Sequence, residues 1–122
     1  RGDGGRLLLK SPQRVFVDEK GKPLCFNSGV RGGSGRARVR LTDWDCDGRV
    51  DILQAAFNAR LVRQVAEKDG RYVFRYYKKV GEEQLQGHTC CPTTVDFNAD
   101  GIPDLVIAAE DGYFYYMPNK GK

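Results

Sequence analysis

The chain has 122 residues, of which 40% are hydrophobic and 30% charged, and this composition is typical of one soluble globular domain. It contains no apolar run near the ~18 residues that a membrane-spanning helix requires, and no signal-peptide pattern at its start. Its formal net charge of +4 is too small to make nucleic acid the expected partner.

Residues 1–35 predict a hairpin and a connector. Residues 14–18 alternate in polarity, 19–23 have turn composition and 24–26 are again apolar, so we expect a β-hairpin over 14–27. Residues 28–35 are rich in glycine, which is typical of a flexible connector.

Residues 36–77 predict four consecutive antiparallel strands. Arginine alternates with apolar residues over 36–41, and this period of two predicts a strand with a basic face and an apolar face. The next strands are expected at 50–57, 60–66 and 71–77. The pair Asp69-Gly70 is a strong hairpin signal between the last two of them.

A second cycle of strands is expected over 89–117. The predicted strands are 89–95, 104–109 and 113–117, with a turn at Asp111-Gly112. The chain ends before a fourth strand of this cycle. The four cysteines fit no C-x-x-C spacing, so they predict neither a zinc site nor a redox pair.

One acidic stretch occurs twice, 53 residues apart. Residues 43–53 read DWDCDGRVDIL and residues 96–106 read DFNADGIPDLV. Each copy has an oxygen-bearing side chain at positions 1, 3, 5 and 9, a glycine at position 6 and an aromatic residue at position 2. A period near 50 residues is typical of repeat architectures.

This oxygen-rich pattern predicts a site for a hard cation such as Ca²⁺, which takes six to eight oxygen ligands. The expected ligands of the first loop are the side chains of Asp43, Asp45, Asp47 and Asp51 with the carbonyl of Arg49. Those of the second loop are the side chains of Asp96, Asn98, Asp100 and Asp104 with the carbonyl of Ile102. Because the second loop has one carboxylate fewer, we expect it to bind the ion more weakly.

Four other interpretations fit this pattern less well. EF-hand and dockerin loops need a carboxylate near position 12 and helical flanks, whereas Gln54 and Ile107 stand there between strands. Zinc is disfavoured because the loops offer oxygen ligands and no histidine. A metal-free Asp/Gly turn would account for one loop but not for two matching copies.

A strand followed by D-x-D/N-x-D-G-x-x-D and an apolar pair resembles the FG-GAP/VCBS repeat, which forms calcium-carrying β-propeller blades such as those of integrin alpha subunits. The likeness covers about residues 36–117 and is strongest over 92–116. It implies an all-β fold of four-stranded antiparallel blades, with two structural Ca²⁺ ions that each pin the first hairpin of a blade.

The resemblance divides the chain into three parts. It implies a blade at 36–80 with the first calcium loop, and a blade at 81–122 with the second loop and no fourth strand. Residues 1–35 would supply strands of a preceding blade or a closing strand, plus the connector. A propeller needs four to eight blades and this chain supplies two to two and a half, so we expect a part of a larger propeller. A strand at 7–10 or 15–18 is expected to pair beside 113–117.

The implied function is an extracellular, secreted or cell-surface binding or scaffold module, with the bacterial periplasm as a further location. Its expected partners are other blades or copies of itself, and a polysaccharide or a protein ligand, with no nucleic acid and no membrane insertion. The alternative is a fragment of a propeller-type carbohydrate-active enzyme such as a polysaccharide lyase, in which His88 would serve as an acid or base. We expect the fragment alone not to be an enzyme.

Overall fold

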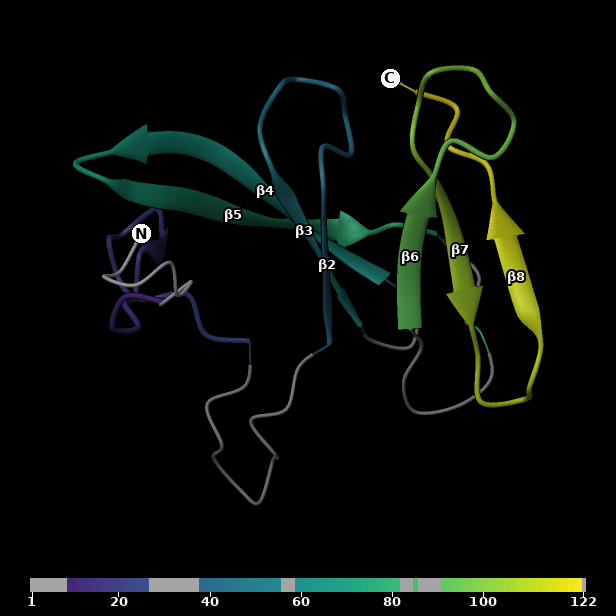
Figure 1. The fold of residues 1–122 in the computed structure, drawn as a ribbon, viewed down its shortest axis with the longest axis horizontal. Helices are drawn as coiled ribbons and strands as arrows, with labels where there is room; N and C mark the ends of the chain where they lie inside the picture. Colours follow the sequence, from purple (N-terminus) through teal and green to yellow (C-terminus); the bar gives the residue numbers. More distant parts are fainter. Residues whose placement is uncertain (1–8, 27–37, 56–58, 82–84, 86–90, 122) are drawn as a thin grey trace, which may run out of the picture.

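The computed structural model describes residues 9–26, 38–55, 59–81, 85 and 91–121, and these residues form eight strands and no helix. This confirms the all-β class. The strands are β1 (Phe16–Asp18), β2 (Val39–Thr42), β3 (Asp51–Ala55), β4 (Ala59–Lys68), β5 (Arg71–Lys79), β6 (Cys91–Val95), β7 (Asp104–Ala108) and β8 (Phe114–Met117). They form a five-stranded sheet in the order β1-β5-β4-β3-β2 and a three-stranded sheet in the order β6-β7-β8 (Figure 1).

The predicted meander is confirmed in the five-stranded sheet, where β2 to β5 follow one another with antiparallel pairing. The turn between β4 and β5 has positive φ at both Asp69 (52°) and Gly70 (69°), which a two-residue turn of this hand requires. The second predicted cycle is confirmed as the antiparallel sheet of β6, β7 and β8.

Replacing Gly70 by alanine is expected to destabilise the chain by about 1 kcal/mol, because an L-residue with a Cβ disfavours positive φ. A Cβ added there would meet no atom within 4 Å, so the effect is conformational and not steric. Urea unfolding measures it. Asp69→Asn is the control with little expected change, since asparagine tolerates this backbone region. Equal stability of Gly70→Ala and wild type would contradict the expectation.

The N-terminal hairpin is present only in part. The amide of Leu24 donates to the carbonyl of Phe16 over 2.9 Å, and Val17 forms an isolated bridge with Pro23, but no returning strand follows among the residues described up to position 26. β1 pairs in parallel with β5, so that Val17 lies opposite Val73. The ring of Phe16 packs 5.6 Å from that of Phe74 between centroids.

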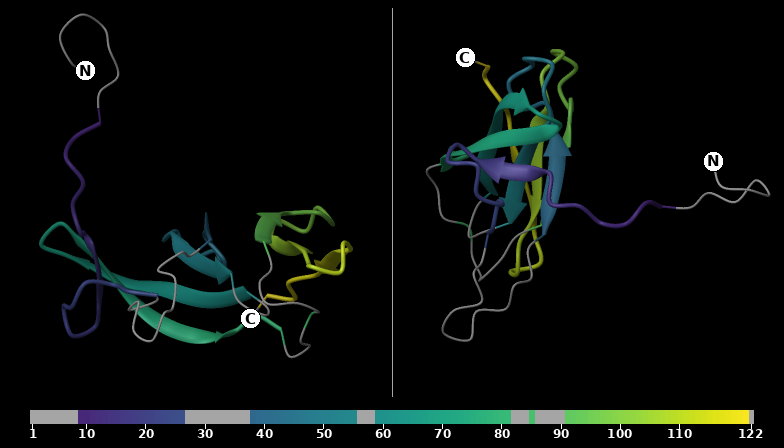
Figure 2. Two further views of the ribbon diagram at one scale, coloured as in Figure 1. Left: turned by 90° about the horizontal axis from the view of Figure 1, so that it is seen from below. Right: turned by 90° about the vertical axis from the view of Figure 1, so that its left-hand side faces the viewer.

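The predicted closing strand beside residues 113–117 is therefore wrong for the described part of the chain. β1 lies at the edge of the five-stranded sheet remote from β8 (Figure 2), and Leu9 and Lys10 are exposed and form no strand. Pairing with β5 leaves Val17 only 3% exposed, and this burial of an apolar side chain favours the observed edge. Residues 7 and 8 lie outside the described residues.

β3 is buried on both faces, and its two faces belong to different clusters. Leu53 packs with Leu105 and Ile107 of β7, which joins the two sheets in one core. Ile52 points to the opposite face and packs with Val62 and Phe74. Burial on both faces is typical of a strand that lies between two packed layers.

β2 departs from its predicted apolar face. Val39 and Leu41 are 50% and 54% exposed, because β2 is the edge strand of the five-stranded sheet and nothing in the described part of the chain covers that face. β2 lies beside β6 of the other sheet. The guanidinium of Arg38, just before β2, contacts the sulfur of Cys91 in β6 at 2.9 Å. Within the described residues, no helix is long and apolar enough to cross a membrane.

Candidate metal centre

The two acidic loops occupy the same place in the two sheets. Residues 43–50 join β2 to β3, and residues 96–103 join β6 to β7. Both connections lie at the same end of the molecule (Figure 1). In each case the loop thus closes the first hairpin of its meander.

The carboxylate at position 1 organises each loop. Asp43 accepts backbone hydrogen bonds from Asp47 (3.0 Å) and Gly48 (2.9 Å). In the second loop the same two bonds run to Asp96, from Asp100 (3.0 Å) and Gly101 (2.9 Å). A carboxylate that accepts backbone N–H groups from its own loop holds the chain in a tight curl.

The backbone of the two loops bends at the same positions. φ is positive at loop position 6, with 84° at Gly48 and 87° at Gly101, as the glycines predict. It is also positive at position 4, with 56° at Cys46 and 61° at Ala99. Neither residue type favours that region, so this second bend carried no sequence signal.

The carboxylate at position 9 connects each loop to a more distant segment. This segment is β4 for the first loop and the residues just after β8 for the second. Asp51 is 1% exposed and accepts from the amides of Trp44 (3.2 Å) and Gln64 (2.9 Å). Asp104 is 0% exposed and accepts from the amides of Phe97 (3.1 Å) and Asn119 (2.8 Å). These two carboxylates therefore stabilise the tertiary structure whether or not an ion is bound.

The two buried carboxylates differ in their acidity. Burial raises the pKa of Asp51, and the two backbone donors offset this only in part. The amide of Asn119 is the main cause that lowers the pKa of Asp104, and the hydroxyl of Tyr116, 3.0 Å from Asp104 Oδ2, adds to it. A positive charge near Asp51 would favour its ionised form.

Three predicted ligands of the first loop converge. One oxygen from each of Asp43, Asp45 and Asp51 lies within 4.8 Å of the others. Both carboxylate oxygens of Asp45 are buried without a hydrogen-bond partner among the described residues, although one forms an ion pair. Buried oxygens that lack donors fit a cation that prefers oxygen ligands, so this donor set suits Ca²⁺.

Asp47, also a predicted ligand, is not part of this converging group. Its Oδ1 accepts from the amide of Arg49 at 2.9 Å, and its Oδ2 lies 3.3 Å from the guanidinium of the same residue. Asn98 is at position 3 of the second loop, and its Oδ1 accepts a hydrogen bond from the amide of Asp100 at 3.0 Å. The ligand roles of the Arg49 and Ile102 carbonyls stay predictions.

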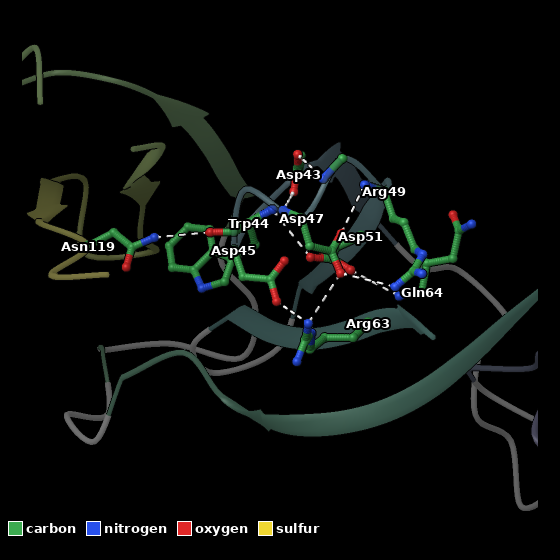
Figure 3. A network of polar contacts seen from close by, with 10 residues as sticks. Asp43, Trp44, Asp45, Asp47, Arg49, Asp51, Arg63, Gln64 and Asn119 are labelled. Atoms are coloured by element: carbon green, nitrogen blue, oxygen red, sulfur yellow. Dashed lines mark hydrogen bonds and ion pairs between the residues drawn. The ribbon is translucent and has the colours of Figure 1, made fainter. Parts of the chain in front are cut away.

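Arg63 is a member of the site that the sequence did not indicate. It extends from β4 towards the first loop (Figure 3), forms an ion pair with Asp45, and places Nη2 3.4 Å from Asp47 Oδ2. Its guanidinium also lies 5.8 Å from the centre of the Tyr77 ring. Arg63 lies beside the first loop because of the register of β4 against β3, and no local sequence motif predicts that register.

A cavity of about 670 Å³ opens beside the first loop. Its lining includes Trp44, Asp45, Arg63, Tyr77 and Asn119. The side-chain amide of Asn119 donates to the carbonyl of Trp44 at 3.2 Å and so links the loop to the residues that follow β8. The cavity combines two aromatic rings with charged and amide groups.

No protein-family model matches this chain, and no curated protein or solved structure matches it either. His88, the glycine-rich connector at 28–35 and residues 56–58 lie outside the described residues. The loops and their surroundings therefore carry the functional argument.

Proposed function

We propose that this chain is a calcium-stabilised, extracellular binding or scaffold module built from propeller blades of the FG-GAP/VCBS kind. One structural Ca²⁺ would bind in each acidic loop, at Asp43, Asp45 and Asp51 in the first and at Asp96, Asn98 and Asp104 in the second. The ion would supply the positive charge that holds the acidic groups of a loop together.

The observation that carries this proposal is the agreement between the two loops. Five hydrogen bonds recur at equivalent positions: two to the carboxylate at position 1, one to that at position 5 and two to that at position 9. Both loops also close the first hairpin of a meander. The two loops share one geometry although positions 4 and 8 differ, with Cys46 and Val50 in the first and Ala99 and Pro103 in the second. This agreement supports a common role for their oxygen-bearing positions.

The incomplete second sheet supports the partner that we propose. β8 pairs only with β7 among the described strands, and Tyr113 and Phe114 at its start are 69% and 79% exposed. A meander of four strands, as β2 to β5 form, would place another strand there. Further blades, or copies of this chain, are the proposed neighbours.

The cavity beside the first loop is the proposed place for a carbohydrate or protein ligand. The rings of Trp44 and Tyr77 offer flat apolar faces, and Asp45, Arg63 and Asn119 offer polar groups within the same hollow. This mixture suits a sugar ring or an amphipathic side chain, each of which has an apolar face and hydrogen-bonding groups.

Isothermal calorimetry of Ca²⁺ binding tests the metal sites. We expect two ions per chain in the wild type, and one in each of Asp43→Asn and Asp96→Asn, because each substitution removes a charged carboxylate at position 1 of one loop. Asp69→Asn removes a carboxylate from a turn outside both loops and is expected to leave two. A wild-type chain that binds no Ca²⁺, or single variants that still bind two ions, would contradict the proposal.

A further inference from the structure

The first loop already contains a positive charge, and this charge belongs to the chain itself. The guanidinium of Arg63 contacts Asp45, one of the three converging ligands, and lies 3.4 Å from Asp47. Its side chain is 28% exposed, while those of Asp45 and Asp47 are 11% and 20% exposed. The contact is therefore partly shielded from water, and Figure 3 shows Arg63 reaching the loop from the strand below it.

Arg63 is held at this position by a second interaction. Its guanidinium carbon lies 5.8 Å from the ring centre of Tyr77 on β5, a distance within the range of a cation–π contact. The amide of the next residue, Gln64, donates to Asp51 of the same loop at 2.9 Å. The backbone that carries Arg63 is thus bonded to the loop.

Within the part of the chain that the structure describes, no arginine or lysine forms an ion pair with the second loop. The amide of Asn119 donates to Asp104, as the amide of Gln64 donates to Asp51. Pro118, which precedes Asn119, therefore holds the position in the second sheet that Arg63 holds in the first. Proline has no side-chain donor. Among the described residues, the ion pairs involve carboxylates of the first loop and Glu19, and none involves the second loop.

A guanidinium and Ca²⁺ that share the carboxylate of Asp45 divide its negative charge between them. The ion needs its oxygen ligands at about 2.3–2.6 Å, and two cations that share one carboxylate repel each other. Binding of Ca²⁺ to the first loop must therefore overcome this repulsion or displace Arg63 from Asp45. Among the described residues, the second loop forms no ion pair that would impose this cost.

We infer that Arg63 is an internal counter-ion that competes with Ca²⁺ for the first loop and makes the second loop the tighter site. This inference rests on the proposed calcium function and reverses the order expected from counting carboxylates. Arg63 offsets part of the negative charge of the first loop at low Ca²⁺, and the loop takes the ion only at higher concentration.

Terbium luminescence in the Asp96→Asn variant reports on the first site. Trp44, the only tryptophan, is at position 2 of the first loop and sensitises Tb³⁺ bound there, and the second loop of this variant lacks its position-1 carboxylate. Competition of Ca²⁺ against this signal measures the first-site affinity, and calorimetry of the Asp43→Asn variant measures the second. Arg63→Gln is expected to raise the first-site affinity about tenfold, the scale for removing a unit charge near a divalent ion.

Two variants serve as matched controls. Arg63→Lys keeps the charge and is expected to stay within about threefold of the wild-type affinity. Arg71→Gln makes the same charge change at an exposed residue beside the β4–β5 turn, outside both loops, so the expected change is below about threefold. Tyr77→Ala, which removes an exposed ring, is expected to raise the first-site affinity by about threefold through loosening Arg63.

The outcomes separate this inference from the proposed function. Two Ca²⁺ sites whose affinities do not respond to Arg63→Gln or Tyr77→Ala, or a wild-type first site tighter than the second, would overturn the inference alone. Absence of Ca²⁺ binding in the wild type and in every variant would overturn both. Tyr77→Ala keeps the test valid if Arg63→Gln does not fold.

Discussion

Adding EDTA to the calcium-loaded chain is expected to lower its melting temperature by about 10 °C for each ion that is removed. A ligand that binds only the folded form at a hundredfold excess over its dissociation constant stabilises that form by about 3 kcal/mol per site. For a domain of this size each kcal/mol corresponds to about 3–5 °C. Differential scanning calorimetry with and without EDTA measures the shift.

The control for this experiment is the double variant Asp43→Asn with Asp96→Asn. It lacks one carboxylate in each loop, so its melting temperature is expected to be the same with Ca²⁺ and with EDTA. Equal melting temperatures of the wild type in the two conditions would refute structural ions in these loops. If Arg63 competes with Ca²⁺ for the first loop, the second loop provides most of the shift in melting temperature at low Ca²⁺.

Truncating Leu53 to alanine is expected to destabilise the chain by about 2–5 kcal/mol, the range measured for leucine in a packed core. Leu53 is 0% exposed and packs against Leu105 and Ile107 of the other sheet. Since it contributes to both sheets, we expect them to unfold together. Urea unfolding measures the loss of stability, and hydrogen exchange of the β7 amides shows whether the second sheet is affected.

Leu41→Ala is the matched control, because it makes the same chemical change on the adjacent strand β2 at a residue that is 54% exposed. It is expected to destabilise by less than about 1 kcal/mol. If Leu53→Ala loosened the amides of β3 and left those of β7 protected, the two sheets would be independent units, and the shared core would not be what stabilises them.

The two acidic loops show which features a local stretch of sequence can predict. The spacing of their oxygen-bearing residues, the glycine at position 6 and the strands on both sides depend on residues close together in the chain, and each could be predicted from the sequence. The turn at Asp69-Gly70 was readable for the same reason. A tight turn restricts which residues it accepts, so its sequence carries a signal.

The surroundings of those loops could not be read in this way. The contact of Arg63 with Asp45 and that of Gln64 with Asp51 depend on the register of β4 against β3, in which Val62 lies opposite Ile52. A one-residue slip in register moves a side chain to the other face of a sheet. Local sequence patterns do not specify this register.

The placement of β1 was also decided only by the tertiary structure. A short strand such as Phe16–Asp18 satisfies its backbone equally well beside any open edge, and the family likeness favoured the edge at β8. The structure pairs it with β5, where Phe16 meets Tyr72 and Phe74 and where Glu19 pairs with Arg75. The sequence alone determined the all-β class, the strands and the two oxygen-rich loops, because short-range chemistry specifies them. Side-chain packing between distant segments decided which edge is covered and which loop already has a counter-ion.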